Sequence, residues 1–156
     1  MSERVPMTPE GFQALKDELA ALKAEMPKIS EEIGVAADHG DLKENAEYHA
    51  ARERQGMVVA RMAVIEDQLA RAEVIDPKKL SGPRVKFGAT VILEDEDGDE
   101  RRFRIVGSEE ADVKNGSISI TSPVARALIN REIGDEVTVA TPSGRRLYEI
   151  VDVLWE

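Results

Sequence analysis

Four acidic residues recur at every third position in one short stretch of the chain: Asp38, Asp41, Glu44 and Glu47. Carboxylate oxygens suit Mg²⁺, which keeps several of its waters and accepts only one or two protein carboxylates. Asp41 and Glu44 alone would hold the ion weakly, so a partner would have to supply the remaining ligands. In two-metal phosphoryl chemistry, one ion activates the attacking water and the other stabilises the leaving oxygen. A delivered carboxylate pair could recruit one of those ions.

A structural interpretation of the same two acids stays open. Asp41 could cap a following helix, with Glu44 completing a capping-box-like pair three residues later. Acids are also favoured in a first helical turn by the helix dipole. On a helix, a spacing of three would place both carboxylates on one face.

The only two histidines, His39 and His49, flank these acids. They could ligate zinc together with Asp41 or Glu44, but the spacing matches no closed zinc site. We interpret His39 as a turn residue and His49 as a solvated helix residue.

Two heptad seams surround the acidic stretch and predict the helices that position it. The first seam contains Leu15, Leu19, Leu22, Met26, Ile29 and Ile33, and Thr8-Pro9 is its start signal. The second contains Tyr48, Ala51, Gln55, Val58, Met62, Ile65, Leu69 and Ala72. A short turn at Gly40 predicts an antiparallel coiled-coil hairpin over residues 1–75, about 45 Å long, with its acidic tip at about 38–48. A helical pair buried in a larger core is the alternative.

Short strands replace helices after residue 75. Pro77, Gly82 and Pro83 mark a linker over residues 76–83, and alternating apolar residues begin at Val85. Asp97-Gly98 predicts a hairpin turn, and Ser122-Pro123 opens a short helix. The fold class is therefore α+β, with a compact antiparallel β domain over residues 84–156.

The composition excludes several classes of function. The absence of cysteine rules out disulfides and thiol chemistry. The net charge is −10, with −6 in residues 1–75 and −4 in residues 76–156, so neither half is a basic nucleic-acid binder. No leader or membrane-spanning run is visible, so we expect a cytoplasmic protein.

Three arginines, Arg52, Arg54 and Arg61, follow the acidic stretch. They could be surface partners for acids such as Glu47 and Glu53. Alternatively, they could form a small basic patch for RNA phosphates.

The stretch Gly40–Glu53 resembles the tip signature of the Gre family of bacterial transcript-cleavage factors. Further resemblances run in order along nearly the whole chain: Pro6-Met7-Thr8, Ile65-Glu66-Asp67, Val74-Ile75-Asp76, Phe87–Val91, Arg104–Gly107 and Ser122–Arg126. The resemblance implies a coiled coil followed by an FKBP-like domain. It also implies that the globular domain docks at the rim of the RNA polymerase secondary channel while the coiled coil enters the channel.

The resemblance assigns residue roles as well. Asp41 and Glu44 would share a Mg²⁺ with polymerase and promote cleavage of the backtracked RNA 3′ end by the polymerase's own active site. Tyr48 and Arg52 are candidates for supporting the tip and contacting RNA, and Ser122-Pro123 is the candidate docking segment. We expect a monomer that binds no cofactor alone and is itself no enzyme.

The chain departs from the family pattern at one place, and three alternative functions stay open. Family members often carry a basic residue just before the tip acids, where this chain has Ala37-Asp38, which suggests weaker contact with extruded RNA. The chain could instead inhibit polymerase by blocking the secondary channel, or serve as a structural adaptor. It could also be a peptidyl-prolyl isomerase or chaperone, although the aromatics after residue 75 are scattered singly: Phe87, Phe103, Tyr148 and Trp155.

Overall fold

The computed structural model describes residues 3–42 and 44–156, which divide into two compact units. Residues 12–71 form a helical unit, and residues 3–11 join residues 72–156 in a globular unit. The helical unit is thus narrower than the expected range 1–75. The reason is a pairing between distant segments, because β1 (Val5–Met7) and β2 (Ala72–Val74) form a two-stranded parallel sheet.

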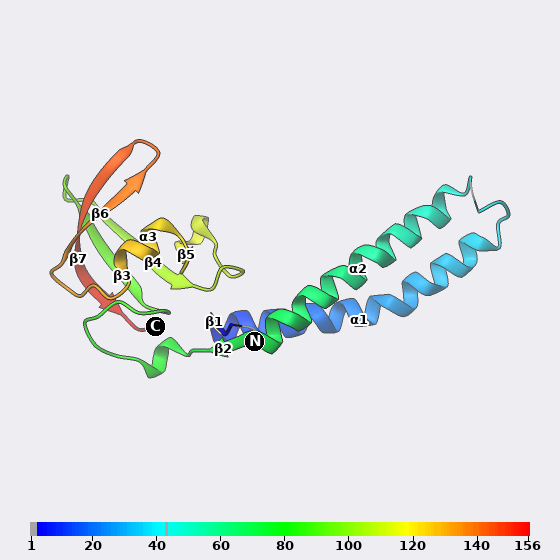
Figure 1. The fold of residues 1–156 in the computed structure, drawn as a ribbon, viewed down its shortest axis with the longest axis horizontal. Helices are drawn as coiled ribbons and strands as arrows, with labels where there is room; N and C mark the ends of the chain where they lie inside the picture. The colour runs from blue at the N-terminus through cyan, green and yellow to red at the C-terminus, as the bar shows by residue number, and fades with distance from the viewer. Residues whose placement is uncertain (1–2, 43) are drawn as a thin grey trace. The chain divides into compact units, whose positions relative to one another are not determined.

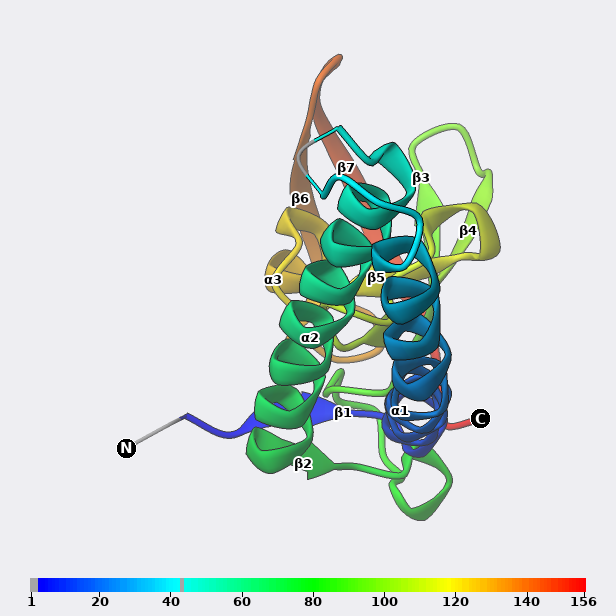
Figure 2. The same cartoon turned by 90° about the vertical axis from the view of Figure 1, so that its right-hand side faces the viewer.

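The helical unit is built from α1 (Pro9–Ala37) and α2 (Ala46–Arg71), which lie side by side (Figures 1 and 2). Thr8 caps α1 as predicted, because its Oγ1 accepts the N–H of Gly11 at 3.1 Å. The two predicted seams are confirmed, since every one of their members is buried or half-buried. The best-buried side chains of the hairpin are Leu15, Ile29, Ala36, Ala51, Val58 and Ile65.

Two bidentate ion pairs join the helices across the seam. Arg61 donates to Glu18 through Nε at 2.7 Å and Nη2 at 2.8 Å, and Arg54 donates to Glu25 through the same two nitrogens at 2.9 Å each. The hydrogen bonds from Arg61 lower the pKa of the Glu18 carboxyl, and its positive charge adds to the effect. The alternative that these arginines are surface partners for acids is confirmed for Arg54 and Arg61, but the acids lie on the opposite helix and are not Glu47 and Glu53.

The globular unit contains a five-stranded sheet in the order β5-β4-β3-β7-β6 (Figure 1). Its strands are β3 (Thr90–Asp95), β4 (Glu100–Val106), β5 (Ser117–Ser119), β6 (Glu136–Thr141) and β7 (Gly144–Leu154). The sheet is mixed and not purely antiparallel as expected, because β5 runs parallel to β4. Between β4 and β5 the chain returns through a 3-10 helix (Val113–Asn115) instead of a tight hairpin.

The core of this unit lies between the sheet and α3 (Pro123–Leu128). Its wholly buried side chains include Val91, Leu93, Ile105, Leu128 and Ile150. The predicted turn at Asp97-Gly98 joins β3 to β4, and Gly98 adopts φ +84°, which favours glycine. Among the described residues, no helix is long and apolar enough to cross a membrane.

Candidate functional site at the hairpin tip

Asn45 organises the connection between the two helices. Its Oδ1 accepts the N–H of Tyr48 at 3.0 Å, which makes it the N-cap of α2. Its Nδ2 donates to the carbonyl oxygen of Ala36 at 2.5 Å, in the last turn of α1. One side chain therefore caps one helix and ties it to the end of the other.

Asp41 and Glu44 lie in the tip loop, outside both helices, and both are exposed. The interpretation of Asp41 as the cap of the second helix was wrong, because Asn45 holds that position and α2 begins at Ala46. The expectation that a helix would place both acids on one face was wrong for the same reason. Lys43, which separates them, lies outside the described residues. The loop presents the two carboxylates to solvent at the end of the hairpin.

The charge of Asp38 is unfavourable for α1, whereas that of Glu47 suits the first turn of α2. Asp38 follows the carboxyl end of α1, where the helix dipole is negative, and the last turn of α1 carries no basic residue. An acid at that position costs roughly 0.3–1 kcal/mol, whereas a lysine or arginine there would stabilise the helix. Helix stability therefore does not explain Asp38. A positive ligand would relieve the repulsion among the acids of the tip.

His39 lies close to one acid of the tip, and the rings of Tyr48 and His49 contact one another. His39 Nδ1 lies 3.9 Å from Glu47 Oε2, and the rings of Tyr48 and His49 meet edge to face with centroids 5.6 Å apart. Among the described residues, the only trio of acidic or histidine side chains close enough to share a metal ion is Asp95, Asp97 and Asp99 in the β3–β4 turn. The zinc alternative at the tip thus gains no support from the geometry.

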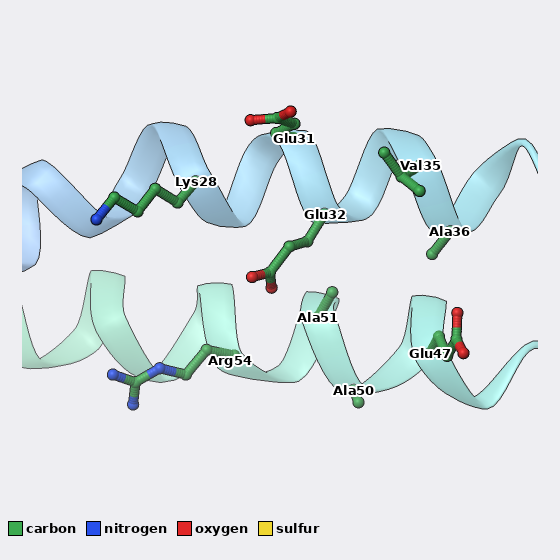
Figure 3. Close-up of a pocket in the computed structure, with 9 residues that line it drawn as sticks. All are labelled: Lys28, Glu31, Glu32, Val35, Ala36, Glu47, Ala50, Ala51 and Arg54. Atoms are coloured by element: carbon green, nitrogen blue, oxygen red, sulfur yellow. The ribbon is translucent and has the colours of Figure 1, made fainter.

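A shallow groove of about 590 Å³ runs between the helices behind the tip (Figure 3). It is lined by Lys28, Glu31, Glu32, Val35, Ala36, Glu47, Ala50, Ala51 and Arg54.

Arg52 is exposed, and its Nη1 lies 3.5 Å from Oε1 of Gln55. Of the three arginines, it is the one for which no salt bridge is found among the described residues. Arg54 and Arg61 are committed to acids of α1, so an RNA-contacting patch reduces to Arg52.

The candidate docking segment opens α3. Ser122 Oγ accepts the N–H of Ala125 at 3.2 Å, and Pro123 occupies the first helical position as predicted. This gives Ser122 a structural role, while Pro123 is exposed. The aromatics of the globular unit serve the core: Phe87 and Tyr148 are buried, and Phe103 and Trp155 pack against the core cluster.

Asn45 is the site residue that sequence reasoning missed. Its signal was present, because asparagine is among the preferred N-caps and Glu47 lies in the first turn that follows it. The nearby Asp41 and Glu44 offered a competing capping pattern, and only the position of the first turn decides between the two.

The structure combines a two-helix hairpin that ends in exposed acids with a separate globular unit. The chain belongs to the GreA/GreB transcription elongation factor family. Residues 5–74 match the family's N-terminal model (Transcription elongation factor, N-terminal), and residues 80–154 match its C-terminal model (Transcription elongation factor, GreA/GreB, C-term).

Several relatives are named transcription elongation factor GreA, and each matches this chain over nearly its full length. The transcription elongation factor GreA of Phenylobacterium zucineum is 58% identical over 98% of this chain and 99% of its own. That of Mesorhizobium japonicum is 58% identical over 96% of this chain and 97% of its own. That of Hyphomonas neptunium is 54% identical over 99% of each chain.

Two solved structures also match along the chain. The GreA factor homolog 1 of Thermus thermophilus is 26% identical and covers 97% of this chain and 99% of its own, with a TM-score of 0.45. The GreA/GreB factor of Nitrosomonas europaea is 23% identical and covers 97% of this chain and 100% of its own, with a TM-score of 0.44.

Proposed function

We propose that this transcription elongation factor binds RNA polymerase and inserts its hairpin tip through the secondary channel. There it stimulates the polymerase's intrinsic Mg²⁺-dependent cleavage of the RNA 3′ end in backtracked complexes. Asp41 and Glu44 act in trans, in the active centre of the polymerase. The observation that carries the proposal is the exposure of both acids in a loop at the tip, in a position that helix capping does not require.

The chemistry assigned to the tip is the capture of a shared Mg²⁺. Asp41 and Glu44 would hold the ion only in part, so the polymerase, the RNA and water would have to supply its remaining ligands. When bound, such an ion would supply activation of the attacking water or stabilisation of the leaving oxygen. The factor is accordingly an accessory protein, and the cleaving active site belongs to the polymerase.

Supporting roles follow from the contacts around the loop. Tyr48 packs beside the loop through its cap hydrogen bond and its ring contact with His49. Arg52 is placed one helical turn further along α2, where its guanidinium can meet phosphates of the extruded RNA. We assign docking on polymerase to the exposed start of α3 at Pro123, with Ser122 holding that turn in shape.

The test is RNA shortening in stalled, backtracked elongation complexes at matched polymerase occupancy. The Asp41→Asn/Glu44→Gln variant removes two charges and keeps the side-chain shapes. Asp38→Asn/Glu47→Gln is the matched control, because it removes the same charge from the same tip. We expect the first variant to lose cleavage by at least about 100-fold, as for other groups that stabilise charge in a transition state. The control should cleave nearly as fast as the native protein.

The Mg²⁺ dependence separates metal recruitment from other roles of the two acids. If the acids recruit the ion, the Asp41→Asn/Glu44→Gln variant needs a higher Mg²⁺ concentration for half-maximal cleavage than the native protein does. An equal loss of RNA cleavage in both double variants would mean that the tip contributes only nonspecific negative charge. Occupancy without any cleavage by the native protein would make the chain a secondary-channel inhibitor or an adaptor.

A further inference from the structure

The groove behind the tip is a concave site that the capture of Mg²⁺ does not use. Its volume of about 590 Å³ is typical of ligand pockets, and all of its lining residues belong to the helical unit. Ala36 and Ala51 face one another between the helices (Figure 3), and both are buried. Val35 is 52% exposed at the edge of the groove, and Ala50 is exposed as well. The groove therefore offers an apolar floor to the side chain of a partner.

Two contacts fix the separation of the helices on either side of this groove. Toward the tip, Nδ2 of Asn45 donates to the carbonyl oxygen of Ala36 at 2.5 Å. Farther from the tip, Arg54 forms its bidentate pair with Glu25 at 2.9 Å. The walls are thus in place before any partner arrives, and this preorganisation lowers the entropic cost of binding.

The charge of the groove selects its occupant. Three acidic side chains line it: Glu31, Glu32 and Glu47. The lining cations are Lys28 and Arg54, and the charge of Arg54 is already met by Glu25, so the excess charge is negative. Such a lining attracts a cationic side chain. It repels RNA phosphates, which proteins bind through lysine and arginine.

The arginine assigned to RNA points away from the groove. Arg52 precedes Arg54 by two residues, which is about 200° around a helix. Accordingly, Arg54 lines the groove and Arg52 does not. The hairpin therefore has two different sides just behind its tip, one with acids over an apolar floor and one with Arg52.

We propose that the groove binds a segment of RNA polymerase that carries an aliphatic side chain next to a lysine or arginine, an inference that rests on the proposed function. The aliphatic side chain packs on the alanines of the floor, and the cation meets the acids that line the groove. Because α2 begins at Ala46 and the groove reaches Arg54, the contact lies within about two helical turns of the tip loop. It holds the hairpin laterally against the polymerase while Arg52 stays turned toward the RNA.

The first test is photo-crosslinking in backtracked elongation complexes at full occupancy. A p-benzoylphenylalanine replaces Ala50 in the groove, Ala63 elsewhere on α2 or Leu42 at the tip, and all three positions are exposed. We expect the probe at Ala50 to crosslink to a polymerase polypeptide, at a segment with a lysine or arginine beside an aliphatic residue. Ala63 is the control, because it lies outside the groove and should not reach that segment.

The second test removes charge from the groove. We expect Glu31→Gln/Glu32→Gln to raise the factor concentration for half-maximal cleavage roughly 3- to 10-fold, as for the loss of exposed ion pairs. This difference should shrink at high salt, which screens the same charges. Asp17→Asn/Glu66→Gln is the matched control, because it removes the same charge from exposed positions of the two helices outside the groove. It should leave that concentration nearly unchanged.

The third test removes apolar surface. Val35→Asn should also raise the half-maximal concentration, because a polar side chain replaces the exposed apolar edge of the groove. Val64→Asn is its control, since Val64 is 47% exposed on α2 outside the groove. Thermal unfolding identifies any variant that loses its fold.

The outcomes separate this inference from the proposed function. A crosslink from Ala50 to RNA, or none to any polypeptide while Leu42 still crosslinks within the polymerase, would overturn the groove as a protein-binding site and leave the proposed function standing. Equal effects in the groove variants and their controls would overturn it too. If no probe crosslinks to polymerase and the native protein does not shorten RNA, the proposed function fails, and the inference falls with it.

Discussion

Replacing Asn45 by alanine removes both hydrogen bonds that organise the tip. The N–H of Tyr48 loses its cap, and the carbonyl of Ala36 loses the 2.5 Å bond from the amide. Loss of an N-cap costs about 1 kcal/mol, and loss of a further hydrogen bond costs about 1 kcal/mol. The free energy needed to open the first turn of α2 should therefore fall by about 2 kcal/mol, which raises the opening equilibrium constant by a factor of about 30.

Amide hydrogen exchange measures this opening at the residue concerned. We expect exchange at Tyr48 to accelerate about 30-fold in Asn45→Ala, whereas the amide of the buried Ile65, far along α2, should keep its native rate. Asn45→Asp is the matched control, because it keeps an acceptor oxygen for Tyr48 and loses the donor to Ala36. Its exchange should accelerate only about fivefold.

Unchanged exchange at Tyr48 in Asn45→Ala would refute the assignment of Asn45 as the cap. Equal acceleration in the alanine and aspartate variants would instead assign the whole effect to the bond with Ala36. We expect the rate of RNA cleavage to fall from the native protein through Asn45→Asp to Asn45→Ala, because a frayed first turn no longer holds Glu44 in place.

Three further predictions concern the scaffold. Ile65→Ala should lower the free energy of unfolding by about 2–5 kcal/mol in urea titrations, because Ile65 is wholly buried in the seam, whereas the exposed Val64→Ala should stay within about 0.5 kcal/mol. Glu18→Gln should cost up to about 1 kcal/mol near neutral pH, because the pair with Arg61 is partly exposed. Since the pKa of Glu18 is lowered from 4.5 in the folded state, this difference should shrink as the pH falls below 4.5 and vanish once the pH lies below the folded-state pKa. A difference that persists at still lower pH would contradict the ion pair. Gly88→Ala should lower the free energy of unfolding by about 1–3 kcal/mol, and with it the melting temperature, because Gly88 has φ +88° and a Cβ would lie 2.8 Å from the ring of Pro77. An unchanged melting temperature would show that the loop relaxes.

Local and periodic features of the chain were predictable from sequence. The seams through Leu15 and Ile65 follow from a heptad spacing, which any sequence with that period must bury on one helical face. The caps at Thr8 and Ser122 and the turn at Gly98 follow from residues whose local chemistry suits those positions. The α+β class with a helical hairpin followed by strands needed no information beyond these signals.

Long-range pairing decided what the sequence left open. The parallel pairing of β1 with β2, and of β5 with β4, joins segments whose short strands carry no signal for their partners. No sequence pattern singles out Glu110, whose carboxylate meets the N–H of Thr8 only because the fold brings two distant segments together. At the tip, residue types alone identified the acids, but only the start of α2 at Ala46 made Asn45 the cap and left Asp41 and Glu44 in the loop. Such contacts depend on which segments meet in space, and a linear pattern does not encode that choice locally.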